Sequence, residues 1–386
     1  MATRISGRTG ATRALLGALT VAGLLLAGAP RVQADSDGGA VKFWETGSSV
    51  HWNQRAIGLF RARGGNPGRG LAYLSLAQYR AVRAALSARS DPPHPSPAGA
   101  AAGASVEVLK VFYPLDAAAL EAELAAQAAA SRWPGEQTRD IAAGVALGRQ
   151  VGAAVLALAS TDGFGALSPG VPPVGPGRWV SSGAPIVRGG YGARPFFITH
   201  GSQLLAPPPP EFGSAAFLAA LTQVRGISDT RTAEQLAIAR RWVPFSAVVF
   251  NEVATDLIVK HRRSELEAAR ILAYANTATF DAIVGCFYTK FHYWYIRPSQ
   301  ADPVITTPVG LPNHPSYPSA HSCETGAFEV VLGDAFPSER GTLAELAAEA
   351  NVSRIYAGLH YWFDGSAGLE IGRTAGRLAL ERQGLE

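Results

Sequence analysis

The sequence contains little cysteine, little methionine and little charge. Its 386 residues include two cysteines and one methionine, and Asp, Glu, Lys and Arg together make up 17%. Two cysteines are too few for a disulfide framework, and no Cys-x-x-Cys pair is present to bind zinc or exchange thiols. Because 47% of the residues are hydrophobic, the composition excludes intrinsic disorder as a description of the whole chain.

Long apolar runs without charge are missing except near the N-terminus. Three arginines precede an apolar run over residues 14–29, and small residues suit cleavage after Ala34. The run is shorter than the roughly 20 residues that span a bilayer. The pattern predicts a secretory signal peptide over residues 1–34, with a retained membrane anchor as the alternative. We therefore expect a secreted or periplasmic mature protein without a stable membrane span.

An excess of charge of either sign is also absent from the predicted mature chain. Cleavage would remove four arginines and leave 30 basic residues against 30 acidic ones. A chain near neutrality has no electrostatic basis for binding nucleic acid or acidic membranes. We expect small-molecule substrates and no nucleic-acid partner, and the sequence does not determine an oligomeric state.

Alternating strand patterns are absent, whereas alanine-rich segments with helical spacing recur. We predict an all-α fold, a multi-helix bundle. Residues 87–104, rich in Pro, Ala and Gly, are predicted to form a loop, and Asp116 to cap the helix that follows it. The predicted helical ranges are 43–60, 71–86, 116–130, 134–159, 214–226, 233–242, 248–261 and 264–288.

Residues 161–211 differ in composition from the helical segments. Ten prolines and many glycines fall in this excursion, but Trp179 and other aromatic side chains within it are costly to leave in water. An ordered irregular segment is therefore expected, which either frames an active-site entrance or covers the bundle. We predict an N-terminal helical region over residues 35–240 that includes the excursion, and a helical core over residues 241–386.

Three clusters of polar residues lie in the last hundred positions. The first holds two cations, the second leads into a helix, and the third adds a cation, a histidine and a carboxylate. Three fixed positive charges beside a helix N-terminus favour binding of a tetrahedral oxyanion. The clusters are Lys290 with Arg297-Pro298, Pro318-Ser319-Ala320-His321, and Ser353-Arg354 with His360 and Asp364.

The same residues suggest individual roles. Ser319 is a natural N-cap for a helix that begins at Ala320, whose backbone amide is then free to donate. His360 and Asp364 are four residues apart, so we predict them on one face of one helix. The carboxylate would hold one imidazole nitrogen as N–H and leave the other free to attack or ligate a central atom. His321 remains as an acid or base.

The order and spacing of these residues resemble the superfamily that unites type 2 phosphatidic acid phosphatases, bacterial acid phosphatases and vanadium-dependent haloperoxidases. The family pattern is Lys-x6-Arg-Pro, Pro-Ser-Gly-His and Ser-Arg-x5-His-x3-Asp, and the match is complete except for Ala320 in place of glycine. The family uses the backbone amide of that residue, which alanine also supplies, although its methyl group adds bulk. Trp52-Asn53 and the residue 171–179 loop are typical of the secreted bacterial haloperoxidase-like branch.

The resemblance implies a role for each matching residue. His360 would be a phosphohistidine nucleophile in a phosphatase or the vanadium ligand in a haloperoxidase. Asp364 would orient His360, and His321 would be the general acid/base, with Lys290 helping to polarise peroxide. The groups that would hold the oxygens of phosphate or vanadate are Lys290, Arg297, Ser319, the Ala320 amide and Arg354.

Two features favour halide oxidation over phosphate-ester hydrolysis. His314 lies five residues before Ser319, where bromoperoxidases of the family carry a second pocket histidine; an ordinary loop histidine is the alternative. Met1 is the only methionine, and a mature chain without thioethers resists hypohalous acid, although alanine-rich composition explains this equally well.

The leading prediction is a vanadium-dependent haloperoxidase-like enzyme with vanadate as cofactor and with hydrogen peroxide and bromide or iodide as substrates. The first alternative is a secreted acid phosphatase that hydrolyses phosphate esters through His360 without a cofactor. A non-catalytic oxyanion-binding protein is the third possibility. Cys286 and Cys323 are predicted on helices beside the site, either as a disulfide or as buried thiols.

Overall fold

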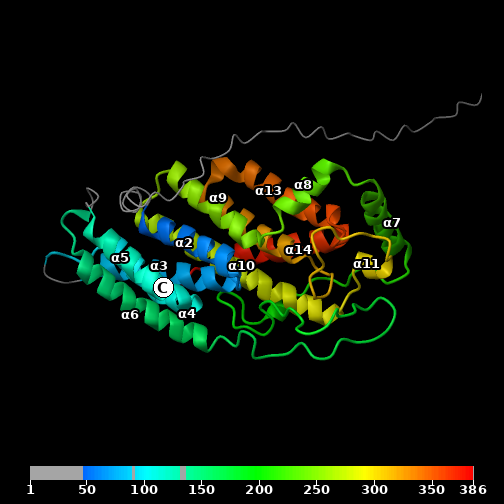
Figure 1. Cartoon of the computed structure of the whole chain (residues 1–386), viewed down its shortest axis with the longest axis horizontal. Helices are drawn as coiled ribbons and strands as arrows, with labels where there is room; N and C mark the ends of the chain where they lie inside the picture. The colour runs from blue at the N-terminus through cyan, green and yellow to red at the C-terminus, as the bar shows by residue number, and fades with distance from the viewer. Residues whose placement is uncertain (1–46, 89–91, 131–135, 386) are drawn as a thin grey trace, which may run out of the picture. The chain divides into compact units, whose positions relative to one another are not determined.

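The computed structural model describes residues 47–88, 92–130 and 136–385. The predicted signal peptide over residues 1–34 lies outside these ranges and stays a prediction. The described residues form thirteen α-helices with short 3-10 turns and no strand, so the predicted all-α fold is confirmed (Figure 1). The helices are α2 (Ser48–Arg63), α3 (Pro67–Ser87), α4 (Pro97–Phe112), α5 (Ala117–Ala129), α6 (Ile141–Ser160), α7 (Ala215–Thr230), α8 (Ala233–Arg241), α9 (Ser246–Lys260), α10 (Glu265–Tyr293), α11 (Pro298–Ala301), α12 (Ala320–Ala335), α13 (Arg340–Tyr356) and α14 (Trp362–Arg382).

Helix α10 is the central element of the packing. It begins with a capping box, in which Ser264 and Glu267 satisfy each other's backbone amides, and it ends at Trp294 in the left-handed conformation. It packs against α3 and α9, which precede it in the chain, and against α12 and α14, which follow it. Leu74 of α3 and Leu272 of α10, both fully buried, belong to the same hydrophobic cluster. One hydrophobic cluster therefore contains residues from both sides of the predicted boundary at residue 240. The division of the chain into two regions at that residue stays a prediction.

The predicted loop over residues 87–104 is wrong for residues 97–104, which belong to α4. The Ser96 hydroxyl accepts a hydrogen bond from the Gly99 amide at 2.8 Å, and Pro97 occupies the first turn, where a missing N–H costs nothing. The alanines and glycines that resembled a loop are buried against α3 and α6. Tertiary packing of small side chains thus outweighs the loop-like composition.

Two helix starts also differ from the predictions. Asp116 does not cap α5; its carboxylate accepts two hydrogen bonds from the Arg63 guanidinium, both at 3.0 Å. The next helix, α6, begins at Ile141, later than the predicted residue 134, because Asp140 accepts from the Ala143 amide at 2.9 Å. An acidic side chain therefore caps α6, whereas the carboxylate of Asp116 is used by Arg63 and leaves α5 without a side-chain cap.

Two pairs of helices approach closely through glycine. A buried glycine face of α6 packs on α4, and a β-carbon added to Gly148 would overlap the carbonyl of Ala100. Helices α12 and α14 pack in the same way, and a β-carbon at Gly372 would overlap the carbonyl of Cys323. Glycine at these positions allows backbone-to-backbone contact that alanine would prevent.

Helix α6 is also the one described helix that is long and apolar enough to cross a membrane. Helices α8 and α9 pass that test only as a pair, and they are bent by 79°. Since core helices of globular proteins also meet this criterion, it is weak evidence for a membrane span.

The excursion over residues 161–211 is irregular, as predicted, apart from a 3-10 turn at Gly201–Leu204. It is held on α10 by Asp281, a fully buried residue. This carboxylate accepts hydrogen bonds from the backbone amides of Phe196 and Phe197 at 2.7 Å and of Ile198 at 3.1 Å. Burial raises the pKa of Asp281 to about 7, against the lowering effect of the three amides. The Asp281 carboxylate therefore positions residues 196–198 of the excursion against α10.

Candidate active site

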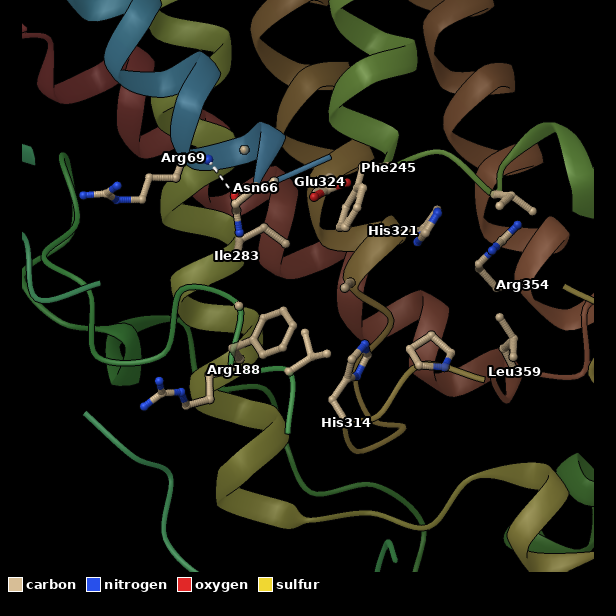
Figure 2. Close-up of a pocket in the computed structure, with 18 of the residues that line it drawn as sticks. Asn66, Arg69, Arg188, Phe245, Ile283, His314, His321, Glu324, Arg354 and Leu359 are labelled. Atoms are coloured by element: carbon tan, nitrogen blue, oxygen red, sulfur yellow. Dashed lines mark hydrogen bonds between the residues drawn. The ribbon is translucent and has the colours of Figure 1, made fainter. Parts of the chain in front are cut away.

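A cavity of about 620 Å³ opens where the C-terminal helices meet the excursion. Figure 2 shows His314, His321 and Arg354 around it. His314, Ala320, His321, Arg354 and His360 line this cavity. The other predicted site residues are fully buried and are not among its lining residues: Lys290, Arg297, Ser319 and Asp364.

The excursion contributes directly to the cavity wall. Phe164, Gly165 and residues 187–189 line the cavity. Four further lining residues lie at the end of the α2–α3 connection and at the start of α3: Gly65, Asn66, Gly68 and Arg69. The sequence left open whether this segment frames an entrance or covers the bundle. It does both, since its start and middle line the cavity while Trp179 is buried against Trp294 with ring centroids 6.1 Å apart.

His360 and Asp364 pair as expected, although not on one helix. His360 precedes α14, and Asp364 lies in the first turn of that helix. The His360 Nδ1 lies 2.8 Å from Asp364 Oδ2, which also accepts from the Ser316 hydroxyl at 2.6 Å and the Tyr361 amide at 3.2 Å. Because a carboxylate must accept here, Nδ1 carries the hydrogen and Nε2 presents its lone pair.

Arg297 joins the two histidines nearest to it. One terminal nitrogen donates to His360 Nε2 at 3.1 Å, and the other lies 3.0 Å from His314 Nδ1. Since a guanidinium can only donate, His360 Nε2 is an unprotonated acceptor. His314 Nδ1 also lies 3.1 Å from the Pro315 carbonyl oxygen, which can only accept, so its two contacts require opposite tautomers of this ring. The pKa values of His314 and His360 lie well below the usual value, mainly because both rings are buried.

The Lys290 ammonium contacts the segment that leads into α12. Its ammonium donates to the carbonyls of Pro315, at 2.9 Å, Ser316, at 2.8 Å, and Pro318. These three bonds use all three of its donors. Lys290 thereby fixes the segment that leads into Ser319, and burial lowers its pKa to about 8.

The α12 N-terminus has the predicted cap. The Ser319 hydroxyl accepts from the Ser322 amide at 3.4 Å, and the Ser319 amide donates to the Asp364 carbonyl at 2.9 Å. Ala320, the first residue of the helix, lines the cavity. The positive end of the α12 dipole is thus directed at the site.

His321 is oriented by a backbone contact. Its Nε2 donates to the Trp242 carbonyl at 2.8 Å. Burial, together with the charge of Arg354, lowers the pKa of His321 to about 3. The imidazole is therefore neutral at physiological pH and is a weak base.

In the described part of the chain, the buried cations Lys290, Arg297 and Arg354 have only one carboxyl group, that of Asp364, near them to balance their charge. Burial lowers the pKa values of both Arg297 and Arg354 to about 10 and acts on Lys290 in the same direction. The nearby carboxyl, Asp364, has a pKa that burial raises to about 6. A bound oxyanion would supply the missing compensation, because buried charges are stable only when paired.

Sequence reasoning missed four polar residues that line the cavity, Asn66, Arg69, Arg188 and Glu324. Glu324 is the one acidic residue among the lining residues described. It lies on α12, four residues after Ala320, and is 5% exposed. Its Oε2 accepts from the Ala247 amide at the start of α9 at 3.2 Å, and burial raises its pKa to about 7. The helical spacing from Ala320 was a usable signal, because residues four apart share a helix face.

Cys286 and Cys323 are both free and fully buried, on α10 and α12 respectively. Burial, followed by a hydrogen bond with Cys286, raises the pKa of Cys323 well above its usual value. The structure therefore shows the thiol alternative and no disulfide between them.

Comparison with known proteins agrees with this geometry. Residues 269–383 match the family model of the PAP2 superfamily. A vanadium-dependent bromoperoxidase of Ascophyllum nodosum is 33% identical over 94 residues, covering 17% of each chain. The chain thus matches only about a sixth of the length of this curated relative. The resemblance predicted from the motifs is confirmed over residues 269–383, the part of the chain that matches the PAP2 superfamily model.

Solved structures extend the similarity to most of the chain. A bacterial vanadium-dependent iodoperoxidase aligns with a TM-score of 0.72 at 22% identity, over 86% of this chain and 95% of its own. A holo-type bacterial vanadium-dependent chloroperoxidase aligns with a TM-score of 0.64 at 16% identity, over 90% and 95%. At these identities the similarity shows a shared fold.

Proposed function

We propose that this protein is a vanadium-dependent haloperoxidase-like enzyme that uses hydrogen peroxide to oxidise bromide or iodide. The observation that carries the proposal is the arrangement around Arg297, whose guanidinium lies 3.1 Å from the unprotonated Nε2 of His360 and 3.0 Å from Nδ1 of His314. One histidine is ready to ligate, and a second imidazole lies in the same pocket, where its N–H can meet a halide.

The donor set fits vanadate. Among the described residues no three His, Cys, Asp or Glu side chains group together as a metal site. Vanadate, however, is an oxyanion, and one neutral histidine with several cations is a suitable donor set. His360 would bind it through Nε2, and Arg297, Ser319, the Ala320 amide and Arg354 would hold its oxygens. Lys290 would join them only by releasing one of the three carbonyls that use its donors. When bound, vanadate would supply the Lewis acidity that activates peroxide.

The surrounding residues would prepare the reactants. Asp364 keeps the hydrogen of His360 on Nδ1 through the 2.8 Å contact, so Nε2 remains available. Arg297 must release Nε2 as an oxyanion enters, and its guanidinium would then donate to the oxyanion. His321, neutral because of burial and the charge of Arg354, would accept a hydrogen bond from incoming peroxide.

The alternative, an acid phosphatase, also has a specific observation in its favour. The same neutral His360, oriented by Asp364, is suitable as a nucleophile toward phosphorus. A phosphatase also needs an acid for the leaving alcohol, and a pKa of about 3 for His321 makes this residue a poor acid at neutral pH. The same low pKa makes it a weak base toward peroxide, so the preference for the peroxidase reaction rests on the second histidine of the cavity, His314.

One preparation of purified protein, freed of phosphate, tests both functions. Half is assayed for phosphomonoester hydrolysis, and half is loaded with vanadate and assayed with peroxide and bromide or iodide. We expect vanadate-dependent halide oxidation well above the hydrolysis rate, abolished in His360→Ala. Efficient hydrolysis, with vanadate acting only as an inhibitor, would replace the proposal with the phosphatase. Inactivity in both assays would leave the non-catalytic alternative.

We also propose that the protein is exported through its N-terminal signal peptide. The basic and apolar order of residues 1–34 supports this, and mass spectrometry of the protein from an expressing culture tests it. Export with cleavage after Ala34 is expected, whereas an intact N-terminus in the membrane fraction would support the anchor.

A further inference from the structure

The connection between α8 and α9 contacts two of the predicted site residues through its backbone. The Trp242 carbonyl accepts a hydrogen bond from His321 Nε2 at 2.8 Å, and the Ala239 carbonyl accepts one from Arg354 Nη2 at 2.8 Å. His321 and Arg354 both line the cavity, and Figure 2 shows them on the same wall. Residues 239–247, which we call the α8–α9 corner, therefore contact one site residue of α12 and one of α13.

Each of these two contacts determines how a site residue is presented. A backbone carbonyl can only accept, so the bond to Trp242 places the hydrogen of the neutral His321 ring on Nε2. The bond to Ala239 fixes one terminal nitrogen of Arg354, and a second bond, at 3.0 Å, joins Arg354 Nε to the Ser353 hydroxyl. A guanidinium has more donors than these two bonds use, so donors remain for an oxyanion. The corner thus sets the tautomer of one site residue and the orientation of the other.

The Trp242 side chain attaches the corner to α13. This side chain is fully buried, and its indole Nε1 donates to Glu349 Oε1 at 2.9 Å. The same oxygen lies 3.0 Å from Nη1 of Arg241. Glu349 lies on α13, five residues before Arg354, and α8 and α13 pack against each other (Figure 1). The bond from Trp242 to Glu349 and the bond from Arg354 to Ala239 therefore connect the same two elements in opposite directions.

The other end of the corner is attached to α12. Helix α9 has no side-chain cap of its own, but Glu324 of α12 accepts from the Ala247 amide in its first turn at 3.2 Å. Phe250 of α9, fully buried, lies with its ring centroid 6.1 Å from that of Trp242 and 5.3 Å from that of Phe328 on α12. The end of the corner is thus fixed on α12, and the Glu349 contact fixes its beginning on α13.

We propose that Trp242 and Glu349 are positioning residues of the oxyanion site: their hydrogen bond holds the α8–α9 corner where its carbonyls orient His321 and Arg354. Neither Trp242 nor Glu349 is among the residues that line the cavity, so both act through the residues that do. Removal of the Glu349 acceptor leaves a buried indole N–H without its partner, and the corner must shift to satisfy this donor.

The positioning role rests on the proposed function only in its effect on turnover. The orientation of Arg354 and the tautomer of His321 are properties of the protein that are measured without peroxide or halide. The tests below therefore use those two properties as readouts.

Two substitutions of Glu349 form the test pair. Glu349→Ala removes the acceptor, whereas the amide oxygen of Glu349→Gln can still accept from the Trp242 indole. The probe for Arg354 is inorganic phosphate, whose affinity is measured by isothermal titration of the protein freed of oxyanions. We expect Glu349→Ala to bind phosphate roughly 10-fold more weakly, as loss of a partner that orients a binding group does. Glu349→Gln should retain the phosphate affinity of the unmodified protein.

Nitrogen NMR of the histidine side chains gives the second readout, because it shows which ring nitrogen carries the hydrogen. The spectrum of His321→Gln identifies the His321 signals. We expect the hydrogen on Nε2 in the unmodified protein and in Glu349→Gln, and exchange between the two tautomers in Glu349→Ala. Trp242→Phe removes the same N–H and should match Glu349→Ala, and the double variant should be no worse than either single one. A merely structural role of Glu349 would lower stability and change neither readout.

Two further variants are the controls. Glu345→Ala changes an exposed residue of α13, and Arg241→Gln removes the ion pair with Glu349 but leaves the Trp242 hydrogen bond. Both should keep the phosphate affinity and the His321 tautomer of the unmodified protein.

Either readout unchanged in folded Glu349→Ala would overturn the proposal for the site residue that it reports. Absence of phosphate binding by the unmodified protein would likewise overturn it for Arg354. If both readouts change as expected in a protein that oxidises no halide, the proposed function fails and the positioning role remains. Halide oxidation together with two unchanged readouts would do the reverse.

Discussion

The α4–α6 pair and the α12–α14 pair are built in the same way and differ in what they carry. In both, glycine brings two backbones into contact, at Gly148 and at Gly372. The first pair carries a partly exposed network of ion pairs that joins α4, α5 and α6. One of these ion pairs is Arg149 with Glu121, at 2.5 Å. The second places Asp364 against the N-terminus of α12, where cations and histidines are buried.

This difference shows that close packing of two helices does not by itself create a reactive site. It becomes a candidate active site only where it brings a helix N-terminus, a buried carboxylate and unpaired cations to one cavity. The surface network around Glu121 perturbs pKa values too, lowering that of Glu121 to about 2 chiefly through its hydrogen bond with Arg149. That network stays in contact with solvent and faces no cavity of comparable size among the described residues.

The largest expected effect comes from the carboxylate of the second pair. Asp364→Asn should reduce turnover about 10²- to 10⁴-fold, because an amide no longer forces the hydrogen of His360 onto Nδ1. Turnover in the assay described above measures the loss. In the first pair, Glu121→Gln should leave turnover unchanged and cost at most about 1 kcal/mol of stability, as exposed pairs do. Equal activity of Asp364→Asn and the unmodified protein would remove the orienting role.

Glycine substitutions test whether the two pairs are equivalent in packing. Gly148→Ala and Gly372→Ala should each lower the free energy of unfolding by about 3 kcal/mol, because the added methyl group overlaps a carbonyl of the facing helix. Urea denaturation measures both losses. Gly372→Ala should also lower turnover of the folded protein, since α12 must shift, whereas Gly148→Ala should not.

The control for these substitutions is Gly226→Ala on α7, where an added β-carbon meets open space. It should be neutral or stabilising by up to about 1 kcal/mol. Should Gly148→Ala behave like this control, the close approach of α4 and α6 would be unnecessary for stability.

Asp281 connects the excursion with α10. Its substitution therefore tests whether the order of the excursion depends on this contact with the core. Asp281→Asn keeps the shape but loses acceptor capacity toward three backbone amides. We expect a loss of about 2 kcal/mol in the free energy of unfolding and faster hydrogen exchange over residues 196–198. Exchange in α4 and α6 serves as the internal reference; a uniform increase there would indicate global destabilisation.

The smallest expected effect is a pH dependence at Glu324. Its pKa is about 7 in the folded protein and near 4.5 otherwise, so the folded state holds this proton more tightly. The stabilisation is complete below about pH 4.5 and is lost as the pH rises through about 7. Glu324→Gln removes this loss, and its stability relative to the unmodified protein should be about 2 kcal/mol greater at pH 8 than at pH 5.

Urea denaturation of both proteins at the two pH values provides this measurement. Asp281, whose pKa is also raised, is present in both proteins and cancels in the difference. A difference independent of pH would mean that Glu324 keeps the same charge across this range.

Residue order and periodicity determined the all-α class, the irregular excursion and the set of site residues, because each depends on local spacing or on a motif. Ser319 as the N-cap of α12 follows from the same local rule. Spacing alone was insufficient at His360, which precedes α14, and at Asp116, which pairs with Arg63.

Only the tertiary structure decided the remaining features. It turned the loop-like residues 97–104 into a buried part of α4, since burial of small side chains against α6 outweighs their low helical signal. It directed Lys290 to backbone carbonyls and brought Glu324 into the cavity. These outcomes depend on contacts between segments far apart in the chain, whose free energies exceed local preferences and are not encoded in any single stretch of sequence.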